Sequence, residues 1–230
     1  MPEAELHILG GGGIADALDE IVARFERAHG VTIVLRYGTL PQLIDMARQG
    51  GAFDLAVVPR DVLEDTAVRA LIVPGSIRTV ARAGIGVAVR LGAPMPDIGT
   101  PEALKRTLLA ARAVASIPAS ATGARIAEIY AELGIAAEME TRTRAQPGPK
   151  QIAEAVAKGE AELGLFLLNV LIDPRLAIVG PVPPELQREL VYDVALAANA
   201  GVPEVARAFV AFVLSAEAAE VIKEKGMRAG

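Results

Sequence analysis

Two arginines at strand ends carry the clearest potential for chemistry in this chain. Arg60 follows a predicted strand at residues 55–58, and Arg82 precedes a predicted strand at residues 85–89. A guanidinium group in such a place can hold a carboxylate through two parallel hydrogen bonds. These positions favour the capture of a small anion. The alternative is that either arginine is an ordinary solvated surface charge.

A run of four glycines supplies a second candidate anion contact. Residues 10–13 follow a predicted strand at residues 6–9 and precede a helical pattern. The first turn of a helix presents unpaired backbone N–H groups and a partial positive charge, and glycine lets a ligand approach them closely. We predict that Gly11, Gly12 and Gly13 contact the ligand. The alternative is a loop that needs glycine only for a positive φ angle.

The loop at residues 118–125 is the better anion candidate. Ser120 or Thr122 can cap the helix that follows, which would leave other hydroxyl groups and amides, including that of Gly123, to bind an anion. The alternative is that both hydroxyl groups only cap the helix. Loops after two further predicted strands add Thr39, Leu40 and Asn169 to the predicted ligand-binding residues.

No metal site, cofactor site or catalytic residue is evident in the sequence. There is no cysteine, and the two histidines, His7 and His29, lie in a predicted strand and at a predicted helix end, where structural roles are expected. Neither a Gly-x-Ser-x-Gly motif nor a Gly-x4-Gly-Lys-Ser/Thr loop is present. We therefore predict that the ligand is bound without a metal or a cofactor.

The composition limits the choice of partners. The 230 residues are 52% hydrophobic and 3% aromatic, and the formal net charge is −5. A negative net charge does not favour nucleic acid, whereas a small anion responds to the local site. No apolar run approaches the roughly 18 residues needed to span a bilayer, so no direct membrane insertion is expected. The N-terminus lacks a secretory signal pattern, which leaves a cytoplasmic protein or a periplasmic one whose leader was removed.

The order of the predicted elements indicates an α/β fold with two lobes. Strands and helices alternate, and two buried strands, at residues 85–89 and 190–197, bracket the middle of the chain. We expect them to form a two-strand hinge between lobe 1 (residues 1–83 plus 195–230) and lobe 2 (residues 84–194). Lobes of this kind close on a small ligand in the crevice between them.

With its elements in this order, the chain resembles the solute-binding proteins of molybdate-type ABC transporters, which have the type 2 periplasmic binding fold. The similar segments run over nearly the whole chain and are Phe25-Glu26, Tyr37-Gly38, residues 49–54, residues 159–164, residues 209–215 and Glu217-Ala218. The resemblance implies a small anionic ligand, an ABC permease as partner and a periplasmic location.

Where that family has ligand-binding hydroxyl groups, this chain differs. Gly12 or Gly13 stands in place of a serine. Thr39-Leu40 stands in place of Ser-Gly, and Leu167 stands in place of a tyrosine. Specificity for an oxyanion depends on hydrogen bonds of this kind. We therefore expect weak binding of molybdate or tungstate.

The middle of the chain resembles one branch of the family. Residues 81–90, 92–98 and 180–187 look like those of a group that is similar to aconitate isomerase. In that branch Arg82 would suit a carboxylate ligand. The first hypothesis is a solute-binding protein that closes on a small anion, with a carboxylate favoured over molybdate. The alternatives are an isomerase of a small unsaturated polycarboxylate that acts by proton transfer, and a cytoplasmic anion sensor. Conceivable bases for the isomerase, none of which can be assigned, are Tyr37, Glu128 and Tyr130.

Overall fold

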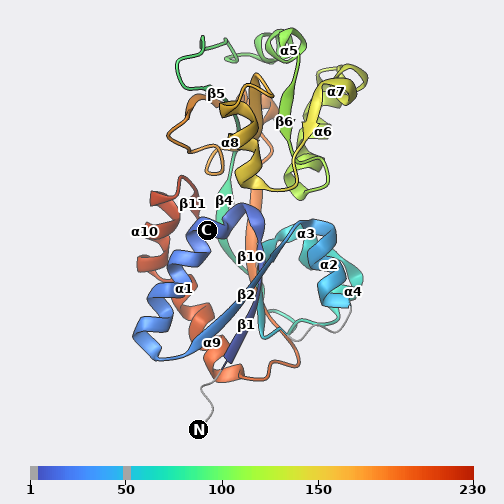
Figure 1. The fold of residues 1–230 in the computed structure, drawn as a ribbon. Coiled ribbons are helices and arrows are strands. Elements are labelled where there is room, and N and C mark those ends of the chain that lie inside the picture. Colours follow the sequence, from blue (N-terminus) through green and yellow to red (C-terminus); the bar gives the residue numbers. More distant parts are fainter. Residues whose placement is uncertain (1–4, 49–52) are drawn as a thin grey trace. The chain divides into compact units, whose positions relative to one another are not determined.

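The computed structural model describes residues 5–48 and 53–230, apart from the side chains of Leu40 and Arg48, and its chain forms two compact units (Figure 1). Unit 1 comprises Met1–Arg82 and Leu190–Gly230, and unit 2 comprises Ala83–Glu189. We expected the chain to return to the first lobe after residue 194. Strand β10 (Leu190–Leu196) instead lies wholly in unit 1, because it pairs with β3 (Leu55–Pro59) from Tyr192 to Leu196.

Unit 1 contains a six-stranded sheet in the order β11-β4-β10-β3-β1-β2. Its other strands are β1 (Glu5–Gly11), β2 (Thr32–Gly38), β4 (Arg78–Ala83) and β11 (Arg228–Ala229). β1 pairs in parallel with both β2 and β3, whereas β10 is antiparallel to β3. The ends of the three parallel strands therefore share one edge of the sheet, which we call the carboxyl edge of unit 1.

Helices cover both faces of this sheet (Figure 1). One face carries α1 (Ala15–His29), α9 (Pro203–Val213) and α10 (Ala216–Glu224), and the other carries α2 (Leu40–Arg48), α3 (Arg60–Glu64) and α4 (Thr66–Arg69). On the α1 face, Phe25 packs edge-on against Phe209 with ring centroids 5.1 Å apart. On the α3 face, Leu43 and Val62 are buried in a cluster with Val58. Burial on both faces explains why β3 is apolar throughout. The sequence predicts a helix over residues 40–49, and its last residue, Gln49, lies outside the described residues.

Unit 2 contains a five-stranded sheet in the order β7-β6-β8-β5-β9. The strands are β5 (Ile85–Arg90), β6 (Val114–Ser116), β7 (Thr143–Ala145), β8 (Leu163–Leu167) and β9 (Leu176–Pro181). Four helices pack around it, and they are α5 (Pro101–Ala110), α6 (Ala121–Glu132), α7 (Ala136–Arg142) and α8 (Pro149–Ala157). β6 is parallel to β7 and β8, so the ends of these three strands form the carboxyl edge of unit 2. Among residues 5–48 and 53–230, no helix is long and apolar enough to cross a membrane.

Candidate functional site

The glycine run closes strand β1 and opens the first helix of unit 1. Gly10 and Gly11 end the strand, and a short 3-10 turn, η1 (Gly12–Ile14), leads into α1. None of the four glycines has a positive φ angle, so the alternative based on φ was wrong. Close contacts require glycine instead. A Cβ on Gly10 would lie 2.6 Å from Cε1 of Tyr37, and one on Gly11 would lie 2.9 Å from Cδ of Pro59.

The cap positions of η1 and α1 have no capping side chain. Gly11 precedes η1 and Ile14 precedes α1, and neither position has a side-chain cap hydrogen bond. A helix start without a capping side chain is suited to hold an anion with its own N–H groups. The predicted contacts Gly11, Gly12 and Gly13 therefore lie together at the carboxyl edge of unit 1.

Thr39 and Leu40 lie at the same edge, where β2 leads into α2. The side-chain oxygen Oε1 of Gln42 accepts hydrogen bonds from both the backbone N–H of Thr39, at 2.8 Å, and its hydroxyl group, at 3.0 Å. Leu40 is the first residue of α2. The polar donors of Thr39 are thus used within their own turn.

Arg60 is held by a buried carboxylate of its own chain. Its Nε donates to Oδ2 of Asp193 at 2.7 Å, and its Nη2 donates to Oδ1 of Asp193 at 3.1 Å and to Oγ1 of Thr79 at 3.1 Å. The Asp193 side chain is fully buried, whereas that of Arg60 is 43% exposed. Asp193 raises the pKa of the Arg60 guanidinium above its ordinary value. The bidentate contact that we predicted for a ligand is therefore made by Asp193.

Arg82 lies at the carboxyl edge of unit 1, on the face that carries α1. β4 runs antiparallel to β10. Ile72, before β4, is bridged to Ala197, just after β10, and Thr79 of β4 lies beside Asp193, earlier in β10, since both bind Arg60. The residue numbers therefore rise along one strand as they fall along the other. The end of β4 consequently lies at the edge where β10 begins and β3 ends. Since side chains alternate along a strand, Arg82 points to the face opposite Thr79, Asp193 and Arg60. The structure does not bring the two predicted arginines together.

The guanidinium of Arg82 is uncommitted. Arg82 is half-buried, and its guanidinium makes no hydrogen bond or ion pair with any residue that the structure describes. It lies directly opposite Arg228 of β11. Opposed residues of an antiparallel pair place their side chains on one face, where like charges repel. Arg228 has an interaction of its own, whereas the guanidinium of Arg82 has none with the described residues.

In unit 2, Ser120 and its neighbours have structural contacts. The Ser120 hydroxyl accepts a hydrogen bond from the N–H of Gly123 at 2.9 Å and donates one to the carbonyl of Ile117 at 2.7 Å. Thr122 is buried in the first turn of α6. A Cβ on Gly123 would lie 2.3 Å from the oxygen of Ile117, so glycine lets the helix approach this loop. Asn169 lies half-buried in the turn after β8. All four residues lie near the carboxyl edge of unit 2.

The three conceivable bases are poorly placed to accept a proton. The Tyr37 hydroxyl donates to Oδ1 of Asp19 at 2.6 Å, and burial raises the pKa of Tyr37. Burial raises the pKa of Tyr130 to about 12. Glu128 is paired with Arg125 at 3.1 Å. No catalytic group is therefore assigned from them.

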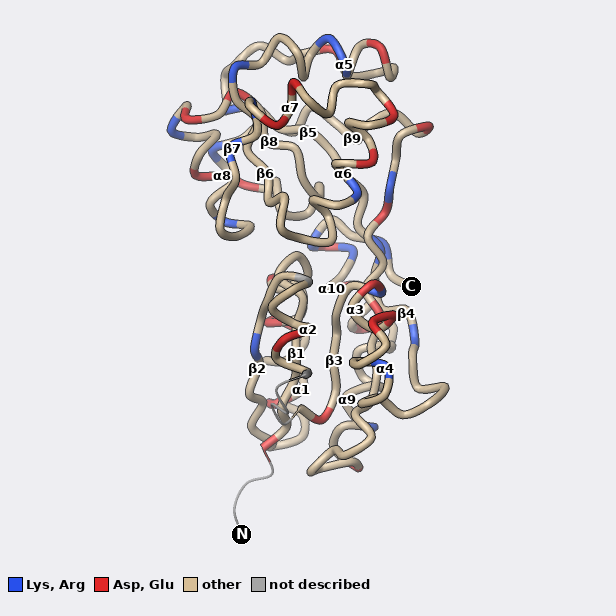
Figure 2. The backbone as a smooth tube through the Cα atoms, turned by 90° about the vertical axis from the view of Figure 1, so that its right-hand side faces the viewer, with Lys and Arg blue, Asp and Glu red and all other residues tan. Residues whose placement is uncertain are grey.

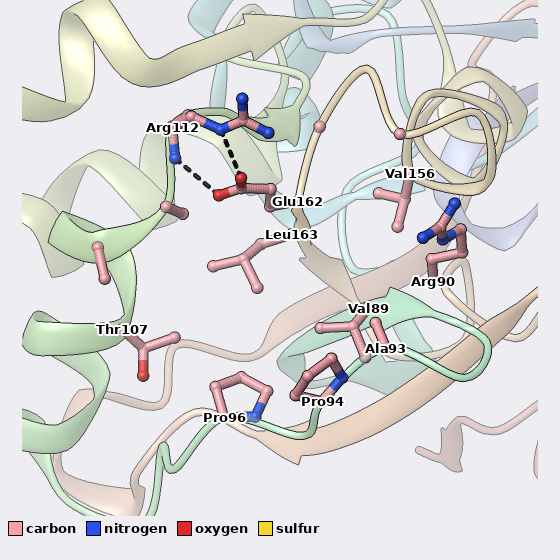
Figure 3. Close-up of a pocket in the computed structure, with 14 residues that line it drawn as sticks. Val89, Arg90, Ala93, Pro94, Pro96, Thr107, Arg112, Val156, Glu162 and Leu163 are labelled. Carbon is pink, nitrogen blue, oxygen red and sulfur yellow. Dashed lines mark hydrogen bonds and ion pairs between the residues drawn. The ribbon is translucent and has the colours of Figure 1, made fainter.

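A cavity of about 590 Å³ lies within unit 2, away from its carboxyl edge (Figure 3). It is found where β5 ends at Arg90 and β8 begins at Leu163, and none of the predicted ligand-binding residues line it. At its rim, Arg112 donates from its backbone N–H and its Nε to the carboxylate of Glu162, at 2.8 and 2.7 Å. Lys and Arg are interleaved with Asp and Glu over both units (Figure 2). Local groups and not the net charge therefore decide where an anion binds.

A family model described as "Bacterial extracellular solute-binding protein" matches residues 6–228, and the chain belongs to this family. It is 30% identical to aconitate isomerase from Pseudomonas sp over 99% of this chain and 88% of the relative. It is 26% identical to the molybdate-binding protein ModA of Rhodobacter capsulatus over 90% of this chain and 81% of the relative. Among solved structures, the periplasmic molybdate-binding protein of Azotobacter vinelandii is similar, with a TM-score of 0.79, 18% identity, and coverage of 96% of this chain and 98% of the other.

These findings confirm the predicted fold class and the resemblance. The fold is that of the type 2 periplasmic binding proteins, and the chain is a ModA-like solute-binding protein. Proteins of this family are substrate-binding components of ABC transporters and are normally periplasmic. No group of three or more His, Asp or Glu side chains in the described part of the chain is arranged to hold a metal ion.

Proposed function

We propose that this protein captures a small organic anion with two or more carboxylate groups, at the carboxyl edge of unit 1. The observation that carries the proposal is the guanidinium of Arg82 at the end of β4, which has no partner among the described residues. Arg82 and the glycine turn lie on strands β4 and β1, which are three strand spacings apart, or about 14 Å. A di- or tricarboxylate has two anionic ends, one for the guanidinium and one for the backbone N–H groups.

The hydroxyl groups near these edges support a carboxylate over molybdate. A tetrahedral oxyanion is recognised by several hydrogen-bond donors around it. The hydroxyl groups of Thr39 and Ser120 already donate to Gln42 and to the carbonyl of Ile117. A carboxylate needs fewer donors, because one guanidinium satisfies both of its oxygens.

Isothermal titration with a panel of anions tests this proposal. The panel comprises cis-aconitate, citrate, succinate, molybdate, tungstate and sulfate. We expect a polycarboxylate to bind and Arg82→Ala to weaken it by about 30-fold or more, as for loss of a charge-assisted hydrogen-bond pair. Arg78→Ala is the matched control on the same strand, because Arg78 donates to the nearby carbonyls of Gly75 and Ile77 and to no other group of the described residues. Full affinity in Arg82→Ala, or a sub-micromolar Kd for molybdate, would overturn the proposal.

We further propose that the captured solute is passed to an ABC permease. The support is the family, whose members serve as substrate-binding components of such transporters. The test is ATP hydrolysis by the cognate permease complex in proteoliposomes, with and without the loaded protein. Stimulation that requires both protein and solute is the expected result, and no stimulation by the loaded protein would contradict it.

A second candidate function is isomerisation of a small unsaturated polycarboxylate by proton transfer. The observation in its favour is the 30% identity to aconitate isomerase over 99% of the chain. The same anion site would then hold the substrate beside an acid–base group. Proton NMR of cis-aconitate incubated with the protein decides between the two functions. Conversion to the trans isomer supports the isomerase, and binding without conversion supports the solute-binding protein.

A further inference from the structure

Tyr192 of β10 is a buried residue whose hydroxyl group has no hydrogen-bond partner among the residues that the structure describes. The residue is 1% exposed. Tyr37 at the same edge differs, because its hydroxyl donates to Asp19. The Tyr192 hydroxyl is not among the fully enclosed unpartnered atoms of the described residues, so it is open to solvent or to a ligand.

The ring of Tyr192 reaches across the sheet to the glycine turn. Tyr192 is paired with Pro59 of β3, while Gly11 ends β1, one strand further along in the order β10-β3-β1. A Cβ on Gly11 would nevertheless lie 3.0 Å from Cε1 of Tyr192 and 3.5 Å from Cδ1. The side chain therefore leans over the end of β3, and the Cε1 side, which leads to the hydroxyl, is the part nearest Gly11. The Cδ1–Cε1 edge of the ring thus faces Gly11, and the hydroxyl group extends beyond that edge.

The phenol is a donor at every physiological pH. Burial raises the pKa of Tyr192 above its ordinary value, and burial is the only cause of the shift. A protonated hydroxyl group close to backbone N–H groups adds one more donor of the kind that anions accept. Tyr192 also shares its face of the sheet with Arg82, since both point away from Asp193 and Thr79.

We propose that Tyr192 is a ligand-binding residue whose hydroxyl donates a hydrogen bond to a carboxylate of the anion held at the glycine turn. This assignment rests on the proposed function of unit 1. It assigns a phenol donor to Tyr192. The tyrosine that the similar family has at another position is replaced by Leu167 in this chain. From the sequence, Tyr192 was expected only to be part of a buried strand. The one available signal was a hydroxyl group in an otherwise apolar run.

Tyr192→Phe tests the assignment, because the ring and its contacts with Gly11 and Pro59 remain and only the hydroxyl is removed. We expect the affinity for the best polycarboxylate of the panel to fall by about 10- to 100-fold, as for a hydrogen bond to a charged group. The midpoint of urea unfolding without ligand should stay the same, because the hydroxyl that is removed makes no hydrogen bond with the described residues. Tyr130→Phe, a buried tyrosine of unit 2, is the matched control and should keep full affinity.

The outcomes separate this inference from the function on which it rests. If Tyr192→Phe binds like the wild type while Arg82→Ala does not, Tyr192 is no ligand contact and the proposed function stands. If the wild type binds no carboxylate, both fail. If Tyr192→Phe is less stable without ligand, its hydroxyl has a structural partner and the inference is wrong.

Discussion

The buried pair of Arg60 and Asp193 should respond very differently to loss of each partner. In Arg60→Met the stem of the side chain is kept, but the fully buried carboxylate of Asp193 loses both of its donors. An uncompensated buried charge costs about 3–5 kcal/mol. In Asp193→Ala the remaining charge belongs to Arg60, whose side chain is 43% exposed and can turn to water. We expect that change to cost about 1–3 kcal/mol.

Urea unfolding measures these costs as differences in the free energy of unfolding at 25 °C. Thermal unfolding gives a second readout, in which Arg60→Met should lower Tm by about 6–20 °C. The double variant Arg60→Met with Asp193→Ala removes both charges and should be more stable than Arg60→Met alone, because no charge stays buried without a partner.

An exposed pair of the same chemistry provides the control. Arg112 donates to Glu162 with similar distances, but their side chains are 85% and 40% exposed. Arg112→Met should therefore cost less than about 1 kcal/mol. Equal costs for Arg60→Met and Asp193→Ala, or a double variant as unstable as the sum of the two, would refute the reasoning from burial.

Three further changes test other parts of the structure. Gly123→Ala places a Cβ 2.3 Å from the carbonyl oxygen of Ile117, so urea unfolding should show a loss of about 1–3 kcal/mol or more; unchanged stability would contradict this close contact. Gly11→Ala crowds the Tyr192 ring and should weaken polycarboxylate binding in titration, and full affinity would argue against the glycine turn as a contact. Burial raises the pKa of Tyr130 from 10.0 to about 12. As the pH rises, Tyr130 ionises in the unfolded chain before it ionises in the folded protein. The folded protein therefore loses about 3 kcal/mol of its free energy of unfolding between pH 10 and about pH 12, and keeps it below pH 10. The difference in unfolding free energy between wild type and Tyr130→Phe should shift accordingly between pH 9 and 12, and a constant difference would refute it.

Much of the fold follows from local patterns in the sequence. The helical spacing before Gly30 and the apolar run at residues 55–58 predict α1 and β3 to within one or two residues. The fold of residues 78–97 was harder to predict, since the sequence indicated only one strand there, at residues 85–89. The structure adds β4 directly before it, with Gly84 between two strands that belong to different sheets. β4 is half polar, and only its pairing with distant strands makes it a strand.

The candidate site was harder to predict because hydrogen-bond partners are not local. Arg60 stands at a strand end, as expected, but its partner Asp193 is 133 positions further along the chain. Spacing alone does not show that this guanidinium is occupied and that of Arg82 is not. For Ser120 both readings were open, and the bonds to Gly123 and Ile117 show the capping role. Tyr192 was missed because its position over Gly11 depends on the strand order.

The protonation of the tyrosines separates the two candidate functions. A proton shift along a carbon chain needs a base whose pKa lies near the working pH. Tyr37 and Tyr130 have raised pKa values and stay protonated, which suits donation to an anion and not removal of a proton from carbon. We therefore expect cis-aconitate to bind without turnover. Should NMR show turnover, Tyr37→Phe is the decisive variant. Loss of the rate with retained affinity would identify Tyr37 as the proton-transfer group, despite its hydrogen bond to Asp19.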